Sequence, residues 1–122
     1  MGTKILVIDD DEAVLEFLRL KLGRDFTIAT LADARKAVET ATAQRPDVVL
    51  CDIDMPHMNG AEVAAAFGKN PALAKVPLIF LTGVLSPSEV AGMGGVVSGH
   101  RSIAKRAPVA ELVAGIRASL AR

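Results

Sequence analysis

The sequence predicts a single α/β domain in which helices cover both faces of one doubly wound, parallel sheet. Short apolar runs alternate five times with segments of helical periodicity, and the connections between them are short. A length of 122 residues suits one domain with a substantial core. Right-handed crossovers between parallel strands would place the carboxyl ends of all strands at one edge of the sheet, where ligands bind in this fold class.

Five apolar segments are the predicted strands. Residues 5–8 and 48–52 are the clearest, because each is an uninterrupted apolar run that stops at aspartates. Residues 26–29 form a weaker strand, residues 77–82 begin with a proline that marks the entry point, and residues 102–105 form a brief fifth strand.

The predicted helices have recognisable starts and ends. Asp11 is expected to cap the first helix, Gly23 to end it, and Asp33 to cap the second. An alanine-rich third helix follows the loop at residues 55–60, and Pro108 opens a final amphipathic helix.

The fourth helix is expected to be short or soft. Ser86 and Pro87 make a good helix start, but glycines then occupy positions 92, 94, 95 and 99. Each glycine inside a helix costs roughly 0.5–1 kcal/mol relative to alanine.

Composition excludes several classes of protein. The formal net charge is zero, so the sequence predicts neither nucleic-acid binding nor attachment to an anionic membrane. Cys51 is the single cysteine and lies in an apolar run, which predicts a buried thiol and suits a reducing cytoplasm. No signal peptide or membrane-spanning stretch is visible, and we expect one cytoplasmic domain, residues 1–122, with no attached effector domain.

Two clusters of aspartates end the first and third strands. Asp9, Asp10 and Asp11 follow residues 5–8, while Asp52 ends residues 48–52 and Asp54 comes two residues later. Several carboxylates within a few ångströms of each other repel strongly unless a cation lies between them. Carboxylate oxygens are the preferred ligands of hard divalent ions, so this pattern predicts a Mg²⁺ site.

Two more polar residues end the fourth and fifth strands, namely Thr82 and Lys105. Four strands therefore point polar termini at the same edge. This arrangement resembles the receiver domain of the two-component response regulator family, and the resemblance covers nearly the whole chain. It is carried by Asp9, Asp10, the run from Pro46 to Asp52, Met55, Pro56, Asn59, Gly60, Thr82 and Lys105.

The resemblance implies a flavodoxin-like (βα)5 fold with strand order 2-1-3-4-5. It also implies that Asp52 is the phosphoacceptor for a phosphoryl group from a histidine of a sensor kinase or phosphotransfer protein. Asp10 and Asp52 would hold Mg²⁺, or alternatively Mn²⁺, directly. Asp9 would hold the ion partly through water, and the backbone carbonyl of Asp54 would supply a further oxygen.

The same resemblance assigns the phosphoryl contacts. Thr82 would donate its hydroxyl and Lys105 its ammonium to the phosphoryl oxygens, and Gly83 has no side chain to block the donor. This assignment fits the chemistry, since a carboxylate is a competent acceptor and phosphoryl transfer requires positioning and neutralisation of charge.

Other polar residues have simpler interpretations. Asp11 is best explained as a helix cap, and the side chain of Asp54 is expected to face solvent at the mouth of the site, where it could influence dephosphorylation. His57 and His100 are expected in polar loops as solvated residues.

Three features depart from the family pattern. Arg106 follows Lys105 where proline is usual, which predicts a trans bond, because a cis bond before a non-proline residue costs about 2.5–4 kcal/mol. Ser102 occupies the place of the usual aromatic switch residue, so it and Thr82 are the expected switch residues. The third departure is the glycine-rich fourth helix. Partners or a second subunit would bind the face of the fourth helix, fifth strand and fifth helix, and we hypothesise that phosphorylation orders residues 86–99.

The leading functional prediction is a phosphoacceptor signalling domain that regulates an unknown downstream protein. Such a domain is no enzyme beyond assisting its own phosphorylation and dephosphorylation. One alternative is an interaction module that keeps the fold but works without phosphorylation. A further alternative is a haloacid-dehalogenase-like phosphatase, suggested by Asp52 and Asp54, although that motif normally follows the first strand of a longer chain.

Overall fold

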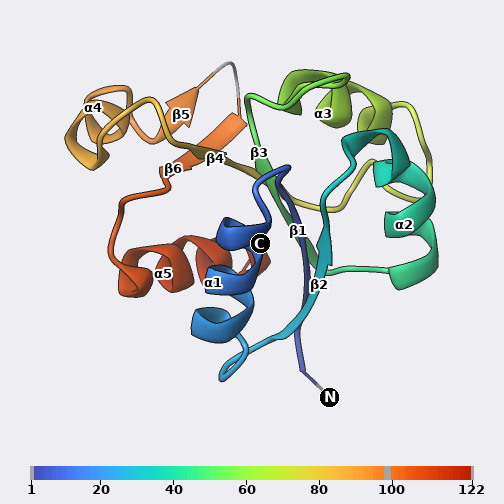
Figure 1. Cartoon of the computed structure of the whole chain (residues 1–122), viewed down its shortest axis with the longest axis horizontal. Coiled ribbons are helices and arrows are strands. Elements are labelled where there is room, and N and C mark those ends of the chain that lie inside the picture. Colours follow the sequence, from blue (N-terminus) through green and yellow to red (C-terminus); the bar gives the residue numbers. More distant parts are fainter. Residues whose placement is uncertain (1, 98–99, 122) are drawn as a thin grey trace.

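The computed structural model describes residues 2–97 and 100–121 and contains a six-stranded sheet in the order β2-β1-β3-β4-β6-β5 (Figure 1). The strands are β1 (Lys4–Ile8), β2 (Thr27–Leu31), β3 (Val48–Asp52), β4 (Leu78–Thr82), β5 (Val96–Val97) and β6 (His100–Ala104). The helices are α1 (Glu12–Leu22), α2 (Ala37–Gln44), α3 (Gly60–Gly68), α4 (Pro87–Gly92) and α5 (Val109–Leu120), with a 3₁₀ turn (Ala34–Lys36) before α2.

The predicted topology is confirmed. β2, β1, β3, β4 and β6 are parallel and correspond to the five predicted strands in the order 2-1-3-4-5. The sequence did not predict β5, a two-residue strand that pairs antiparallel with β6. It follows Gly94 and Gly95, whose positive φ angles of 72° and 74° are a conformation that glycine adopts without strain.

Helices cover both faces of the sheet, and each face has its own apolar cluster. Figure 1 shows α1 and α5 side by side on one face and α2 and α3 on the other. The first cluster joins Leu18 and Ile116 to the residues of β1, β3 and β4 that face this side, and the second joins Ala41 and Phe67 to the alternate residues of the same strands. Burial on both faces explains why these strands are continuously apolar in sequence.

The helix starts agree with the sequence. The Asp11 carboxylate accepts the Ala13 N–H at 2.9 Å, and Gly23 ends α1. Asp33 caps the 3₁₀ turn before α2 in the same way. Ser86 forms a reciprocal capping box with Glu89, yet α4 has only six residues, as its glycines predicted. Residues 98 and 99, at the end of the segment that we expect phosphorylation to order, lie outside the described part of the chain.

Some element boundaries differ from prediction. β2 covers Thr27–Leu31, later than the predicted residues 26–29, because Phe26 instead packs into the core under α1. His100 was wrongly expected in a polar loop. It begins β6, is half-buried, and its ring lies 5.0 Å from that of Phe80, because pairing with β5 extends the strand backwards. No helix in the described ranges has the length and apolar character that a membrane crossing requires.

Candidate functional site

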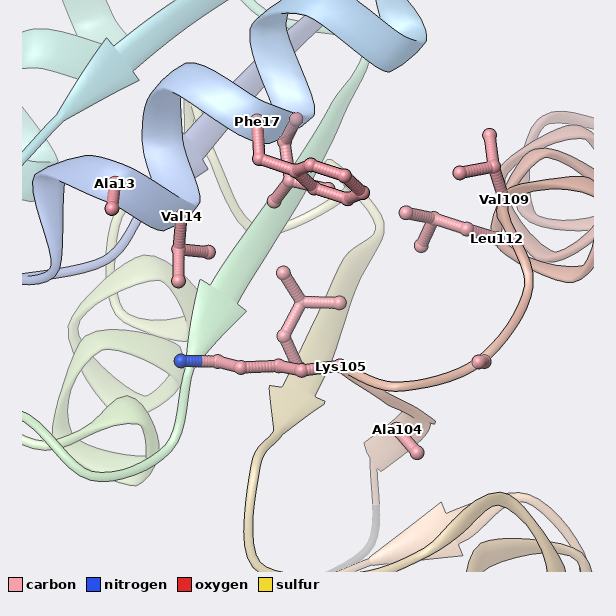
Figure 2. A pocket seen from close by; sticks show the side chains of 10 residues that line it. Ala13, Val14, Phe17, Ala104, Lys105, Val109 and Leu112 are labelled. Carbon is pink, nitrogen blue, oxygen red and sulfur yellow. The ribbon is translucent and has the colours of Figure 1, made fainter.

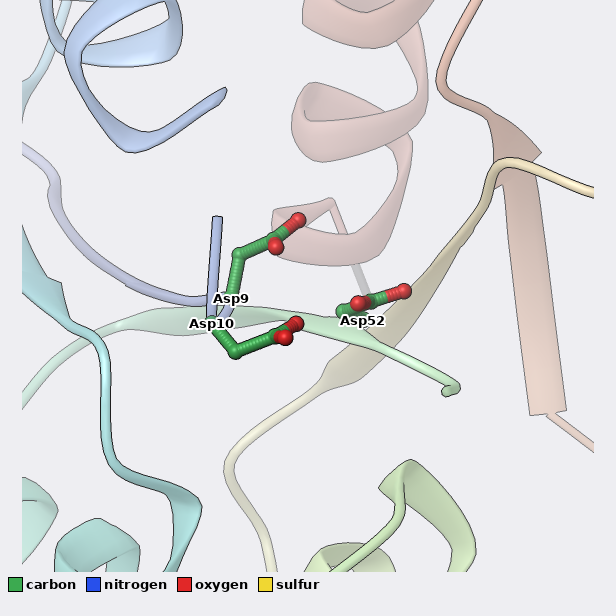
Figure 3. A group of neighbouring side chains, drawn as sticks. All are labelled: Asp9, Asp10 and Asp52. Carbon is green, nitrogen blue, oxygen red and sulfur yellow. The ribbon is translucent and has the colours of Figure 1, made fainter. Parts of the chain in front are cut away.

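Three carboxylates gather at the carboxyl edge of the sheet (Figure 3). β1 and β3 are neighbours, with Ile8 opposite Cys51, so the residues that follow them, Asp9 and Asp52, lie side by side. One oxygen from each of Asp9, Asp10 and Asp52 lies within 4.8 Å of the others. Asp9 and Asp52 are buried, and Asp10 is exposed at the mouth. The predicted acidic site therefore exists as a geometric cluster.

The backbone around Asp9 fixes its carboxylate. Its N–H donates to the Leu31 carbonyl at 3.1 Å, and its Oδ1 accepts the Asp11 N–H at 2.9 Å. Its Oδ2 is fully buried and, within the described residues, accepts no hydrogen bond of good geometry. That oxygen instead lies 2.6 Å from the Lys105 ammonium, a charge contact without hydrogen-bond alignment. A buried, negatively charged oxygen in this state is a suitable ligand for a metal ion.

Lys105 reaches both buried carboxylates. Its Nζ also lies 3.2 Å from Asp52 Oδ1, and its backbone N–H donates to the Thr82 carbonyl at 2.8 Å. The Lys105–Arg106 bond is trans, as the sequence predicted. The replacement of proline by Arg106 therefore does not prevent the lysine from pointing into the acidic site.

The site holds more carboxylates than cations. Burial raises the pKa of Asp52 to about 6, the charge of Asp9 adds to the rise, and Lys105 offsets part of it. Burial alone would lower the pKa of Lys105, but contacts with Asp9 and Asp52 outweigh burial and raise it. One ammonium thus faces two buried carboxylates, with Asp10 adjacent.

Thr82 ends β4 beside β3, with Leu81 opposite Asp52 in the parallel register. Its side chain is buried, and its Oγ1 accepts weak hydrogen bonds from the N–H groups of Val84 at 3.3 Å and Leu85 at 3.4 Å. The oxygen is the acceptor in both bonds, so the hydroxyl hydrogen can still be donated to another group. Thr82 therefore links the acidic edge to the loop that leads into α4.

The remaining predicted site residues lie farther out. Gly83 is exposed, and a Cβ atom there would lie 3.5 Å from Lys105 Cδ, an ordinary contact distance. The side chain of Asp54 is exposed, as predicted. Ser102 is buried opposite Phe80, two positions before the end of β6, and its hydroxyl donates to the His100 carbonyl at 3.1 Å.

The structure also shows a role for Gly60 that sequence reasoning missed. Gly60 is buried at the start of α3, and its N–H donates to the Ile53 carbonyl at 2.8 Å. A Cβ atom at Gly60 would lie only 2.6 Å from the Asp52 carbonyl oxygen and 3.2 Å from the Phe80 ring. Glycine therefore lets α3 pack directly against the backbone of Asp52. An Asn-Gly pair at a helix start just after an acidic strand end was the available signal.

Comparison with known proteins identifies the family. The family described as response regulator receiver domain matches residues 5–117. Among curated relatives, the DNA-binding response regulator MtrA of Mycolicibacterium paratuberculosis is 36% identical over the whole chain, which covers 53% of that protein. The response regulator MprA of Mycolicibacterium vanbaalenii is 35% identical over the whole chain, which covers 52% of it. The chain thus spans about half the length of these relatives.

Solved structures share the fold. A putative response regulator from Chloroflexus aurantiacus superposes with a TM-score of 0.84 at 27% identity, covering 100% of both chains. The chemotaxis protein CheY4 of Vibrio cholerae gives a TM-score of 0.82 at 26% identity, covering 98% of this chain and 100% of its own. With the acidic cluster and lysine at the sheet edge, these matches lead to one conclusion: the chain belongs to the response regulator receiver domain family.

Proposed function

We propose that the protein is a phosphoacceptor signalling domain in which Asp52 receives a phosphoryl group from a phosphohistidine of a sensor kinase or phosphotransfer protein. The observation that carries the proposal is the pairing of Lys105 Nζ with both buried carboxylates, at 2.6 Å from Asp9 and 3.2 Å from Asp52. This pairing brings two buried carboxylates and a fixed cation together at one edge of the sheet, which supports a role for Asp52 as the nucleophile. The buried thiol of Cys51 suits the reducing cytoplasm, where we place the domain.

The residues present fit a hard divalent cation. Asp9, Asp10 and Asp52 supply oxygen ligands that converge within 4.8 Å, and the buried Asp9 Oδ2 accepts no hydrogen bond within the described residues. We assign Mg²⁺, with Mn²⁺ as an alternative, to these three residues together with the backbone carbonyl of Asp54. When bound, the ion would neutralise negative charge on the carboxylates and on the phosphoryl oxygens.

The chain's own residues would carry the transfer. An Asp52 carboxylate oxygen bonds to phosphorus as the P–N bond to the donor histidine breaks, and the electron pair of that bond returns to the imidazole nitrogen, which takes a proton from water. The Lys105 ammonium and the Thr82 hydroxyl donate to the phosphoryl oxygens. Exposed Gly83 leaves the approach open to the donor. Beyond assisting this transfer and its hydrolysis, the domain would catalyse no reaction.

The read-out would begin at Thr82. Its Oγ1 accepts from Val84 and Leu85, so turning the hydroxyl toward a phosphoryl group would change the loop before α4. We propose that this rearranges the segment from Ser86 through β5, with buried Ser102 coupled through its N–H, which donates to the Gly95 carbonyl at 2.8 Å. The surface of α4, β6 and α5 would then bind an unknown downstream protein or a second copy of the domain. A role in binding nucleic acid or membranes is not proposed for this domain.

The test is Mg²⁺-dependent labelling by a small phosphodonor such as acetyl phosphate, read by intact mass. The native chain should gain one phosphoryl group, and Asp52→Asn should gain none. Equal labelling of both chains would overturn the assignment of Asp52.

A second candidate is an interaction module that works without phosphorylation. The observation that favours it is Ser102, whose buried hydroxyl is satisfied by the His100 carbonyl where the family carries a mobile aromatic ring. Failure of the native chain to form an adduct, under conditions that label other receivers, would favour this alternative.

A further inference from the structure

A pocket of about 210 Å³ lies beside the side chain of Lys105 (Figure 2). It is formed by α1, the ends of β4 and β6, and the start of α5. Its lining residues are Ala13, Val14, Phe17, Leu18, Leu81, Ala104, Lys105, Ala107, Val109 and Leu112. Leu18 and Leu81 belong to the buried core, so the pocket reaches inward to the sheet.

The pocket is almost entirely apolar. Within the described residues, Lys105 is the only charged residue that lines it, and Figure 2 shows the alkyl stem of Lys105 along one wall, with Phe17 across from it. The ammonium is directed elsewhere, toward Asp9 at 2.6 Å and Asp52 at 3.2 Å. Phe17 is 49% exposed at the mouth, and the Lys21 ammonium lies 5.8 Å from the centroid of its ring.

The pocket is large enough for a small molecule. Ala107 is one of the lining residues, so a larger apolar side chain at this position would occupy part of the space. An apolar cavity of about 150 Å³ accommodates benzene. The nearby carboxylates of Asp9 and Asp52 would repel an anionic ligand, whereas a neutral ligand would gain apolar contacts without this repulsion.

We propose that this pocket is a binding site for a small, neutral, apolar ligand of the size of a substituted benzene ring. The ligand would pack against the Lys105 stem and hold the ammonium on Asp9 and Asp52. This contact would link the pocket to phosphorylation, because Lys105 must turn toward the incoming phosphoryl group. The link rests on the proposed function. Ligand binding is therefore expected to slow labelling of Asp52.

Toluene is the probe for the binding test, followed through the methyl NMR signals of Val14, Leu18, Leu81 and Leu112 in the full chain. We expect saturable shifts with a dissociation constant of roughly 1 mM. Ala107→Leu fills the pocket and should weaken binding at least about tenfold, since its side chain takes the volume of the ligand. Ala118→Leu, on an exposed face of α5, is the matched control and should bind as the native chain does.

Phe17→Ala provides a second variant in case Ala107→Leu disturbs the fold. Phe17 is half-exposed, so its removal should leave the domain folded while removing one wall and weakening toluene binding several-fold. The absence of saturable shifts in the native chain, or equal affinity in the native chain and both pocket variants, would overturn the proposal.

The link to phosphorylation is tested separately. Saturating toluene should slow acetyl phosphate labelling of the native chain and have no effect on the labelling rate of Ala107→Leu. Binding with an unchanged labelling rate would overturn the link. Absence of labelling in the native chain, with its toluene binding intact, would overturn the proposed function and leave the binding site established.

Discussion

The Lys105 ammonium lies 2.6 Å from Asp9 Oδ2, a fully buried carboxylate oxygen that accepts no hydrogen bond of good geometry within the described residues. The lysine is thus the cation that balances this oxygen in the protein alone, and it also contacts Asp52. A bound metal ion would compete with Lys105 for these carboxylates, and a phosphoryl group would compete with the carboxylates for Lys105. The stability of the domain, its metal affinity and its reactivity are consequently coupled through Lys105.

Replacing Lys105 with methionine should destabilise the domain at neutral pH. The alkyl stem is retained but two buried carboxylates lose their cation, and loss of one partner from a buried pair costs about 3–5 kcal/mol. Because the Lys105 side chain is 21% exposed, we expect about 2–3 kcal/mol in urea unfolding without metal. Lys69→Met, at an exposed position, should change stability by less than about 0.5 kcal/mol. Equal stability of the two variants would show that the contact with Asp9 contributes little.

The contribution of Asp52 to stability without metal should fall as pH rises from about 4 to about 6. The pKa of Asp52 is raised to about 6 in the folded protein, whereas the pKa of an aspartate in the unfolded chain is about 3.9. Between these values the folded state binds more protons than the unfolded state, so the free energy of unfolding decreases with pH, by roughly 2 kcal/mol. Asp52→Asn removes this titration and should flatten the profile across that window. Urea unfolding in a chelator at several pH values measures both profiles, and a native profile that falls no more than that of Asp52→Asn across the window would contradict the argument.

Gly60→Ala should disturb the acidic site through the backbone. The added methyl would lie 2.6 Å from the Asp52 carbonyl oxygen, so α3 or the end of β3 must shift, at a cost of about 1–3 kcal/mol. The labelling rate of Asp52 should fall because its carboxylate moves with its backbone. Gly68→Ala is the matched control in the same helix, since nothing lies within 4 Å of its added methyl, and it should stabilise by about 0.5–1 kcal/mol. If Gly60→Ala labels at the native rate, the close approach of α3 has no influence on the site.

The position of most of the site could be predicted from the sequence because it follows from topology. Apolar runs that end in Asp9, Asp52, Thr82 and Lys105 had to meet once the strands were parallel, and the register confirms that they do. The requirement for glycine at position 60 could not be predicted, because it comes from close packing of α3 against the Asp52 backbone, a contact that has no local sequence pattern. β5 was missed for a similar reason: two residues are too few for strand periodicity, and their pairing with β6 has no local pattern.

Two adjacent aspartates should behave differently toward Mg²⁺. Asp10 is one of the three clustered carboxylates, whereas Asp11 caps α1 through the Ala13 N–H. Asp10→Asn should reduce the gain in unfolding free energy that Mg²⁺ confers on the native chain, because one anionic ligand is lost. Asp11→Ala should cost about 1 kcal/mol through loss of the cap and leave the Mg²⁺ gain unchanged. Thermal unfolding over a Mg²⁺ titration distinguishes them, and an equal Mg²⁺ gain in Asp10→Asn and the native chain would remove Asp10 from the metal site.

Thr82→Val should loosen the loop before α4 even without phosphorylation. The substitution keeps the shape of the side chain but removes the oxygen that accepts from Val84 and Leu85. The amide hydrogens of Val84 and Leu85 should exchange several-fold faster. Protection of the α4 amides should also fall, because α4 has six residues and a single buried side chain, Val90. Thr82→Ser retains the oxygen and should preserve native protection. If Thr82→Val exchanges like the native chain at these amides, the threonine does not control the loop, and a signal from Asp52 must reach α4 by another route.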